Sequence, residues 1–212
     1  MKKFLLVLLV IVAALAAYVA TRPSEFRLAR SAVIAAPPEI VFANLDDFRR
    51  WEAWSPWEKL DPSMQREFEG PSSGVGASYH WVANEEVGEG RMTITESRPP
   101  QRLAIRLEFV RPFAATNQVA FELSPHVAGT TSIDWSMAGE NGFLGKAIGL
   151  VVDTDELVGA DFEKGLAALK QASEAQAVEA QSAAEAAAAA AAAEPLPEGE
   201  PATPEGVTPA TP

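Results

Sequence analysis

The feature that most constrains this chain is a change of hydrophobic period, from alternation along residues 65–137 to a single helical repeat after Phe143. Alternation of apolar and polar residues is typical of strands that bury one face of a sheet. It is clearest at Leu103, Ile105, Leu107 and Phe109. Because an apolar sheet face has to be covered, and the last helical repeat is the only large apolar partner, we expect an α+β fold. In that fold a curved antiparallel sheet wraps on a long C-terminal helix.

The order of the expected elements is one strand, short helices, six further strands and one long helix. The strands are expected at 26–34, 65–69, 77–83, 88–97, 103–109, 119–123 and 131–137. A helix begins after Pro37, where Pro38 and Glu39 suit the first turn. The long helix is expected from Phe143 to Lys170. Its apolar stripe is formed by Val151, Leu157, Val158, Phe162, Leu166 and Leu169.

The N-terminus is expected to cross a membrane. Phe4–Ala20 contains no charged residue and follows Lys2 and Lys3. At about 1.5 Å per residue it reaches roughly 26 Å, within the usable range for a span. We therefore predict a transmembrane signal anchor over residues 1–21. A cleaved signal peptide is the alternative, because Ala14-Leu15-Ala16 is a small-x-small triplet, although it lies inside the apolar run.

The flanking charges predict which side of the membrane carries the domain. Lys2 and Lys3 favour a cytoplasmic N-terminus, which makes the domain extracytoplasmic, whereas Arg22, Arg27 and Arg30 favour the opposite topology. We expect the first arrangement.

Composition excludes several classes of function. The net charge is −12, and seven glutamates follow Lys170 with no basic residue among them. Nucleic-acid binding is not expected, because phosphates require a clustered basic surface. The chain has no cysteine, which excludes disulfides and thiolate metal sites. Residues 173–212 are rich in Ala, Glu and Pro, and we expect a helical extension of the domain (residues 22–172) followed by a disordered tail.

Five strings of residues, in this order along the chain, resemble the START-like, or SRPBCC, superfamily and its polyketide cyclase/dehydrase and lipid transport branch. The strings are Ala36–Phe42, Trp54–Trp57 with Asp61-Pro62, Gly74–Tyr79 leading to Trp81, Gly129–Thr131, and Gly159–Leu166. The resemblance covers about residues 26–172. It implies a helix-grip fold with a pocket for a hydrophobic ligand between sheet and helix, and it implies no particular reaction.

If such a pocket exists, its lining is expected from the inward faces of the strands and of the last helix. The candidate residues are Trp54, Tyr79, Trp81, Met92, Ile94, Leu107, Phe109, Phe121, Trp135, Val158, Asp161 and Phe162. Two alternatives remain open at this point. The same side chains could fill a plain core, and Trp51, Trp54 and Trp57 could pack short helices onto the sheet instead of forming a pocket entrance.

No metal, cofactor or catalytic residue is assigned. His80 and His126 lie in different elements, so they suggest neither a metal pair nor a catalytic base. Asp161 interrupts the apolar stripe and is the carboxylate to test first for acid or base chemistry, although a solvated helix flank is the better interpretation.

The sequence is therefore compatible with three functions. The first is a membrane-anchored binding domain for a lipid or another hydrophobic small molecule. The second is a polyketide cyclase/dehydrase-like enzyme that uses a pocket carboxylate. The third is an interaction domain without a ligand. Pocket volume separates the third from the other two.

Overall fold

The computed structural model describes residues 1–127 and 129–193, and the expected disordered part of the tail lies outside them. Met1–Val178 forms one compact unit and Glu179–Pro212 a second. In the described part of the second unit, the alanine-rich end of the last helix extends to Ala193, and the side chains of residues 179–192 are solvent-exposed. The first unit contains the folded domain.

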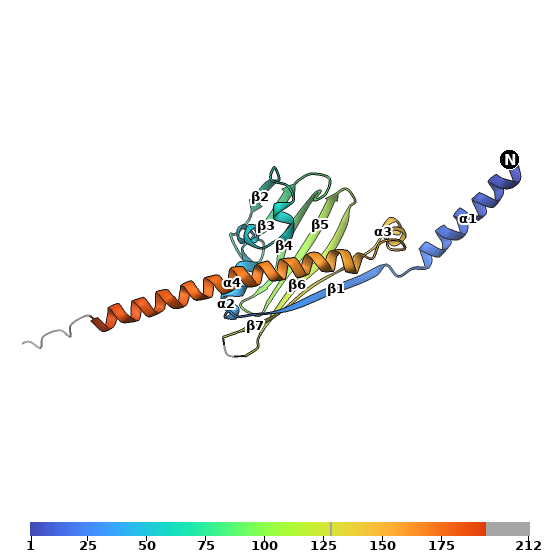
Figure 1. The fold of residues 1–212 in the computed structure, drawn as a ribbon. Helices are drawn as coiled ribbons and strands as arrows, with labels where there is room; N and C mark the ends of the chain where they lie inside the picture. The colour runs from blue at the N-terminus through green and yellow to red at the C-terminus, as the bar shows by residue number, and fades with distance from the viewer. Residues whose placement is uncertain (128, 194–212) are drawn as a thin grey trace, which may run out of the picture. The chain divides into compact units, whose positions relative to one another are not determined.

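Seven antiparallel strands form one sheet in the order β1-β7-β6-β5-β4-β3-β2 (Figure 1). The strands are β1 (Glu25–Ile34), β2 (Gln65–Glu69), β3 (Ser78–Val82), β4 (Glu89–Arg98), β5 (Arg102–Arg111), β6 (Ala115–Pro125) and β7 (Thr131–Glu140). Every pair of neighbouring strands in the sheet is consecutive in the chain, except β1 and β7. The expected strands are all present, most of them longer at their ends than the alternation alone indicated.

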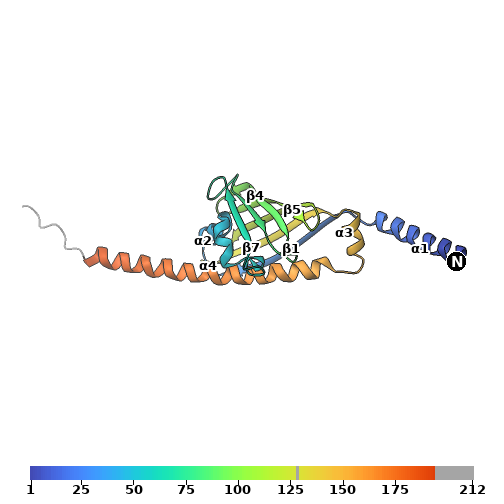
Figure 2. The ribbon, with the colours of Figure 1, turned by 90° about the horizontal axis from the view of Figure 1, so that it is seen from above.

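Helix α4 (Thr154–Ala193) begins in the first unit, and its part up to Val178 lies along one face of the sheet, as Figures 1 and 2 both show. Phe162, Leu166 and Leu169 are buried in the same core as the inward residues of the strands. The helix comes close to β7 at Gly165, where an added Cβ would stand 2.8 Å from the Trp135 ring. A glycine inside a helix costs about 1 kcal/mol relative to alanine, and here it permits that close packing. The fold is therefore α+β and of the helix-grip type.

The prediction of a single long helix from Phe143 to Lys170 is wrong. The structure has a short helix α3 (Phe143–Ile148), and α4 begins only at Thr154. The Asp153 carboxylate accepts hydrogen bonds from the backbone N–H groups of Asp155 and Glu156, at 3.0 and 3.2 Å. It is therefore an N-cap that starts α4. As a result Val151 and Leu157, expected in the buried stripe, are 85% and 62% exposed.

Two short 3₁₀ helices follow helix α2 (Pro38–Asp46) at one side of the sheet, η1 (Phe48–Ala53) and η2 (Pro56–Lys59). The indole N–H of Trp51 donates to the Leu45 carbonyl and that of Trp54 to the Asn44 carbonyl, each at 3.0 Å. These bonds fasten η1 to the end of α2. Trp51 and Trp54 are thus buried residues that pack this segment onto α2.

Helix α1 (Lys2–Thr21) is apolar and, apart from Val19 and a half-buried Ala16, solvent-exposed. By length and composition it could cross a membrane, and a signal sequence near the N-terminus would have the same properties.

Candidate ligand cavity

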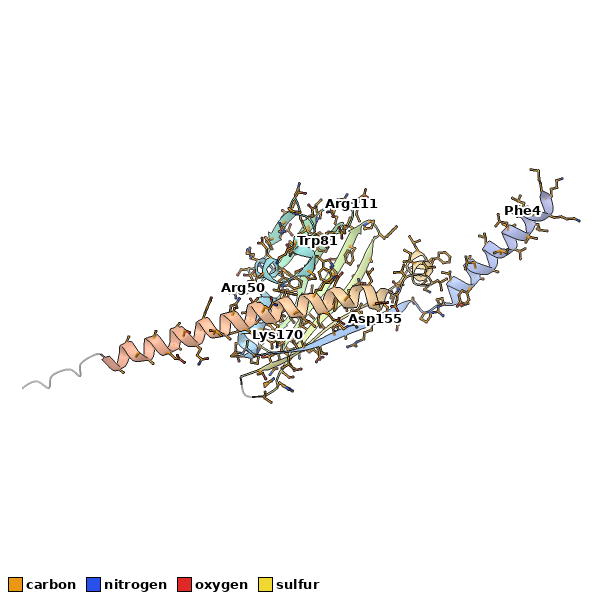
Figure 3. The ribbon with its side chains drawn as sticks, in the orientation of Figure 1. Phe4, Arg50, Trp81, Arg111, Asp155 and Lys170 are labelled. Carbon is orange, nitrogen blue, oxygen red and sulfur yellow. The ribbon has the colours of Figure 1, made fainter. Side chains whose placement is uncertain are left out.

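A cavity of about 390 Å³ lies between the sheet and α4. Drug-sized ligands occupy clefts of about 300–1,000 Å³, so the space suits a small molecule. Its wall is mainly apolar and aromatic. Strands β1 and β3–β7 form one side, and the η1–η2 segment and the start of α4 form the other. In Figure 3 the labelled Trp81 marks the β3 part of this sheet, and Asp155 and Lys170 are spaced along α4.

Eight of the twelve side chains expected from the sequence line this cavity. They are Tyr79, Trp81, Met92, Leu107, Phe109, Trp135, Val158 and Phe162. The Trp135 and Phe162 rings are stacked, with centroids 3.9 Å apart and planes 13° from parallel. One strand and α4 therefore form a continuous aromatic surface.

Four expected residues do not line the cavity. Trp54, Ile94 and Phe121 are at most 1% exposed and pack in the filled part of the core, where the rings of Trp54 and Phe121 meet edge to face. The Asp161 carboxylate points outward and pairs with Lys164 at 2.9 Å. It occupies the solvated helix flank that the sequence offered as its alternative.

The structure adds a polar group to the wall that sequence reasoning missed. Glu58 of η2 is buried, and its carboxylate accepts hydrogen bonds from the Tyr79 hydroxyl and the Arg66 guanidinium, both at 2.7 Å. Burial and the bond to Glu58 raise the pKa of Tyr79, and the same carboxylate raises the pKa of Arg66. Nothing in the sequence distinguishes Glu58 from the exposed Glu52 nearby, so the burial of Glu58 and its hydrogen bonds could not be predicted from the local sequence.

A second polar residue of the cavity wall, Asn117, could have been predicted from the sequence. It precedes Val119 by two positions on β6, and therefore shares its inward face. Asn117 is buried, and its amide lies 3.7 Å from the Met137 sulfur. The Trp135 indole N–H has no hydrogen-bond partner among the described residues, and its ring is edge to face with Trp54 and Trp57. The wall there is aromatic rather than polar.

The cavity reaches the surface at one end of the sheet. Of its lining residues, Glu86 and Glu140 are solvent-exposed. Phe26 lies near the start of β1, Ala115 at the start of β6 and Phe109 near the end of β5, and all three line the cavity. Because neighbouring strands are antiparallel, those termini meet at the same end of the sheet. The mouth is therefore formed at this end of the sheet.

Solved structures with the same fold are found in several bacteria. Protein CV1439 from Chromobacterium violaceum is 17% identical with a TM-score of 0.51, and the match covers 72% of this chain and 99% of that one. The hypothetical protein jhp0584 from Helicobacter pylori is 12% identical with a TM-score of 0.54, over 70% and 88% of the two chains. Aha1 from Colwellia psychrerythraea, solved as a dimer, is 16% identical with a TM-score of 0.51, over 70% and 96%. These likenesses concern the fold alone.

No curated protein matches the chain. The family model described as polyketide cyclase/dehydrase and lipid transport matches residues 25–174, which are most of the chain and include every strand and the cavity wall. The resemblance seen in the sequence is thereby confirmed, and with it a fold that binds hydrophobic ligands. The chain belongs to the polyketide cyclase/dehydrase and lipid transport family.

Proposed function

We propose that this protein is a membrane-anchored binding domain that holds a lipid or another apolar small molecule between the sheet and α4. The observation that supports the proposal is the cavity itself, with its apolar and aromatic wall and a volume suited to a small molecule. A packed domain without a ligand would leave no such space. The anchor in this proposal is α1, whose composition and exposure suit a lipid environment.

The polar groups of the wall support binding over catalysis. A general acid or base needs an atom within hydrogen-bond reach of the reacting group. Both carboxylate oxygens of Glu58 are engaged, one by Tyr79 and the other by Arg66. Asp161, the carboxylate considered from the sequence, faces outward. The other wall carboxylates, Glu86 and Glu140, are exposed at the mouth.

Native mass spectrometry of the full chain, extracted from its own membranes in mild detergent, tests this proposal. We expect a bound small molecule in the unmodified protein. The variant Leu107→Trp should lose it, because the larger ring would project into the cavity. The matched variant Arg106→Trp should keep it, because Arg106 is exposed on the outer face of the same strand. Absence of any bound molecule across lipid and non-lipid growth conditions, or full retention in Leu107→Trp, would contradict the proposal.

A further inference from the structure

Large apolar side chains are exposed around the mouth of the cavity. We call Val110, Phe113, Phe143, Leu144, Ile148 and Val151 the apolar rim. Phe113 is 60% exposed, Phe143 56% and Val151 85%. Single exposed apolar residues are ordinary on protein surfaces, whereas a group of them marks an interaction site.

The rim lies at the same end of the sheet as the mouth. Phe109 pairs with Ala115 and Arg111 with Glu89, so Val110 and Phe113 belong to the turn end of β5 and β6 beside the wall residues. Helix α3 follows the end of β7 after only Asn141 and Gly142. Figures 1 and 2 both show α3 at the end of the sheet where β1 begins. The two parts of the rim therefore border one opening.

The chain itself joins this end to α1. Only Arg22, Pro23 and Ser24 separate Thr21, the last residue of α1, from the start of β1. The Ser24 carbonyl accepts a hydrogen bond from the Asn141 N–H at 2.7 Å, which fixes the linker to the β7–α3 connection. A linker of this length spans at most about 14 Å. If α1 crosses a bilayer, the surface of that bilayer is within this distance of the end of the sheet where the mouth lies.

We propose that the apolar rim docks on the bilayer that anchors α1, so that the cavity mouth opens at the membrane surface. The inference rests on the anchoring part of the proposed function. A lipid surface suits the rim because its apolar side chains can enter the headgroup boundary. Arg22 of the linker, Arg27 near the start of β1 and Lys146 of α3 can approach anionic headgroups. The exposed carboxylates of Glu86 and Glu140 at the mouth oppose this attraction, so the apolar side chains provide the main contact. The tether favours this occupant over a second protein, because it holds the bilayer at high local concentration.

The absence of cysteine from the sequence permits a direct test with single labels. The full chain is reconstituted in phosphatidylcholine–phosphatidylglycerol vesicles, with an environment-sensitive fluorophore on one introduced cysteine. Phe113→Cys, Phe143→Cys and Val151→Cys report on the rim. Val127→Cys is the matched control, because Val127 is 62% exposed in the turn between β6 and β7, at the opposite end of the sheet. Val10→Cys reports on α1. Lipids with a quencher on the acyl chain are then added, and far-UV circular dichroism verifies the fold of each variant.

Docking predicts that the labels at the three rim positions and at Val10 lose most of their fluorescence, whereas the label at Val127 keeps it. If Val10 is quenched while the rim positions behave like Val127, the chain is anchored and the docking proposal is overturned. If Val10 is not quenched either, the anchoring fails, and the docking that depends on it fails with it. Ligand retention measured by mass spectrometry is independent of these labels, so a failure of binding is recognised separately.

Discussion

At the scale of single residues, the wall of the cavity combines stacked rings with one buried ionic network. Burying a carboxylate is expensive unless its oxygens are paired. Glu58 meets that requirement with two partners from the sheet, Tyr79 on β3 and Arg66 on β2. The network therefore fastens η2 to the strands at one side of the cavity, and its members come from three separate elements.

The phenol of Tyr79 should resist ionisation. Burial is the largest cause of its raised pKa, and the hydrogen bond to the Glu58 carboxylate adds to it. An unfolded tyrosine ionises near pH 10, so unfolding releases a proton above that pH. Stability should therefore fall as the pH rises above about 10. Phenolate absorbance of the folded protein, as the difference between the unmodified chain and Tyr79→Phe, should show no ionisation of Tyr79 at its ordinary pKa.

Glu58→Gln provides the control for this titration. It removes the negative charge and keeps a hydrogen-bond acceptor, so the pKa of Tyr79 should shift down toward the ordinary value. Burial persists in this variant, and we expect only part of the shift to disappear. A Tyr79 that ionises at the ordinary pKa in the unmodified, folded protein would contradict the network.

At the scale of elements, the break between α3 and α4 decides which side chains reach the core. Residues 149–153 separate the two helices, and α4 starts where Asp153 caps its first turn. Arg30 of β1 then pairs with Asp155 in that turn at 3.2 Å and with Glu163, farther along α4, at 3.0 Å. Phe162 and Leu166 consequently face the sheet, and the residues before the cap remain at the surface.

Removal of the cap should loosen the start of α4. Asp153→Ala is expected to cost about 1 kcal/mol, the usual value for an N-cap. This corresponds to amide hydrogen exchange about fivefold faster in the first turn of the helix. Asp153→Asn is the matched control, since asparagine caps about as well as aspartate and should preserve the protection. Equal protection in the alanine variant would show that packing alone sets the beginning of α4.

At the scale of the whole molecule, an apolar helix and a family domain are joined by a linker of three residues. More than half of the net charge of −12 comes from the seven glutamates that follow Lys170, away from the linker along the sequence. The arrangement leaves the basic residues Arg22 and Arg27 next to the end of α1. Such a distribution suits a surface with anionic lipids.

The proposal that α1 anchors the chain gives a prediction at this scale. The full chain should remain in the membrane fraction after alkaline extraction, and its intact mass should include the N-terminal residues. Leu8→Lys together with Val12→Lys should release it, because each charge near the centre of a span costs about 2.5–3.5 kcal/mol. The control pair Val127→Lys and Val178→Lys lies outside α1 and should have no such effect. A mature protein that lacks α1 would establish cleavage instead.

The sequence by itself determined the strands, the sheet-on-helix architecture and most of the aromatic wall. Alternation depends only on neighbouring residues, so it identified Leu107 and Phe109 as inward-facing before any contact was known. The sequence also contains a signal for the start of α4: Asp153 and Glu156 have the spacing of a capping box. The prediction of one long helix overlooked this signal.

Only the tertiary structure decided which inward residues meet empty space. Trp54 and Phe121 are as apolar as Trp135, but they meet one another and fill the core, whereas Trp135 borders the cavity. A pattern along one strand indicates which face is buried, but it does not indicate which residues lie opposite that face. For this reason the sequence did not predict the role of Glu58, whose partners Tyr79 and Arg66 come from other elements. It did not predict the mouth either, because the mouth forms where the ends of antiparallel strands from distant parts of the chain meet.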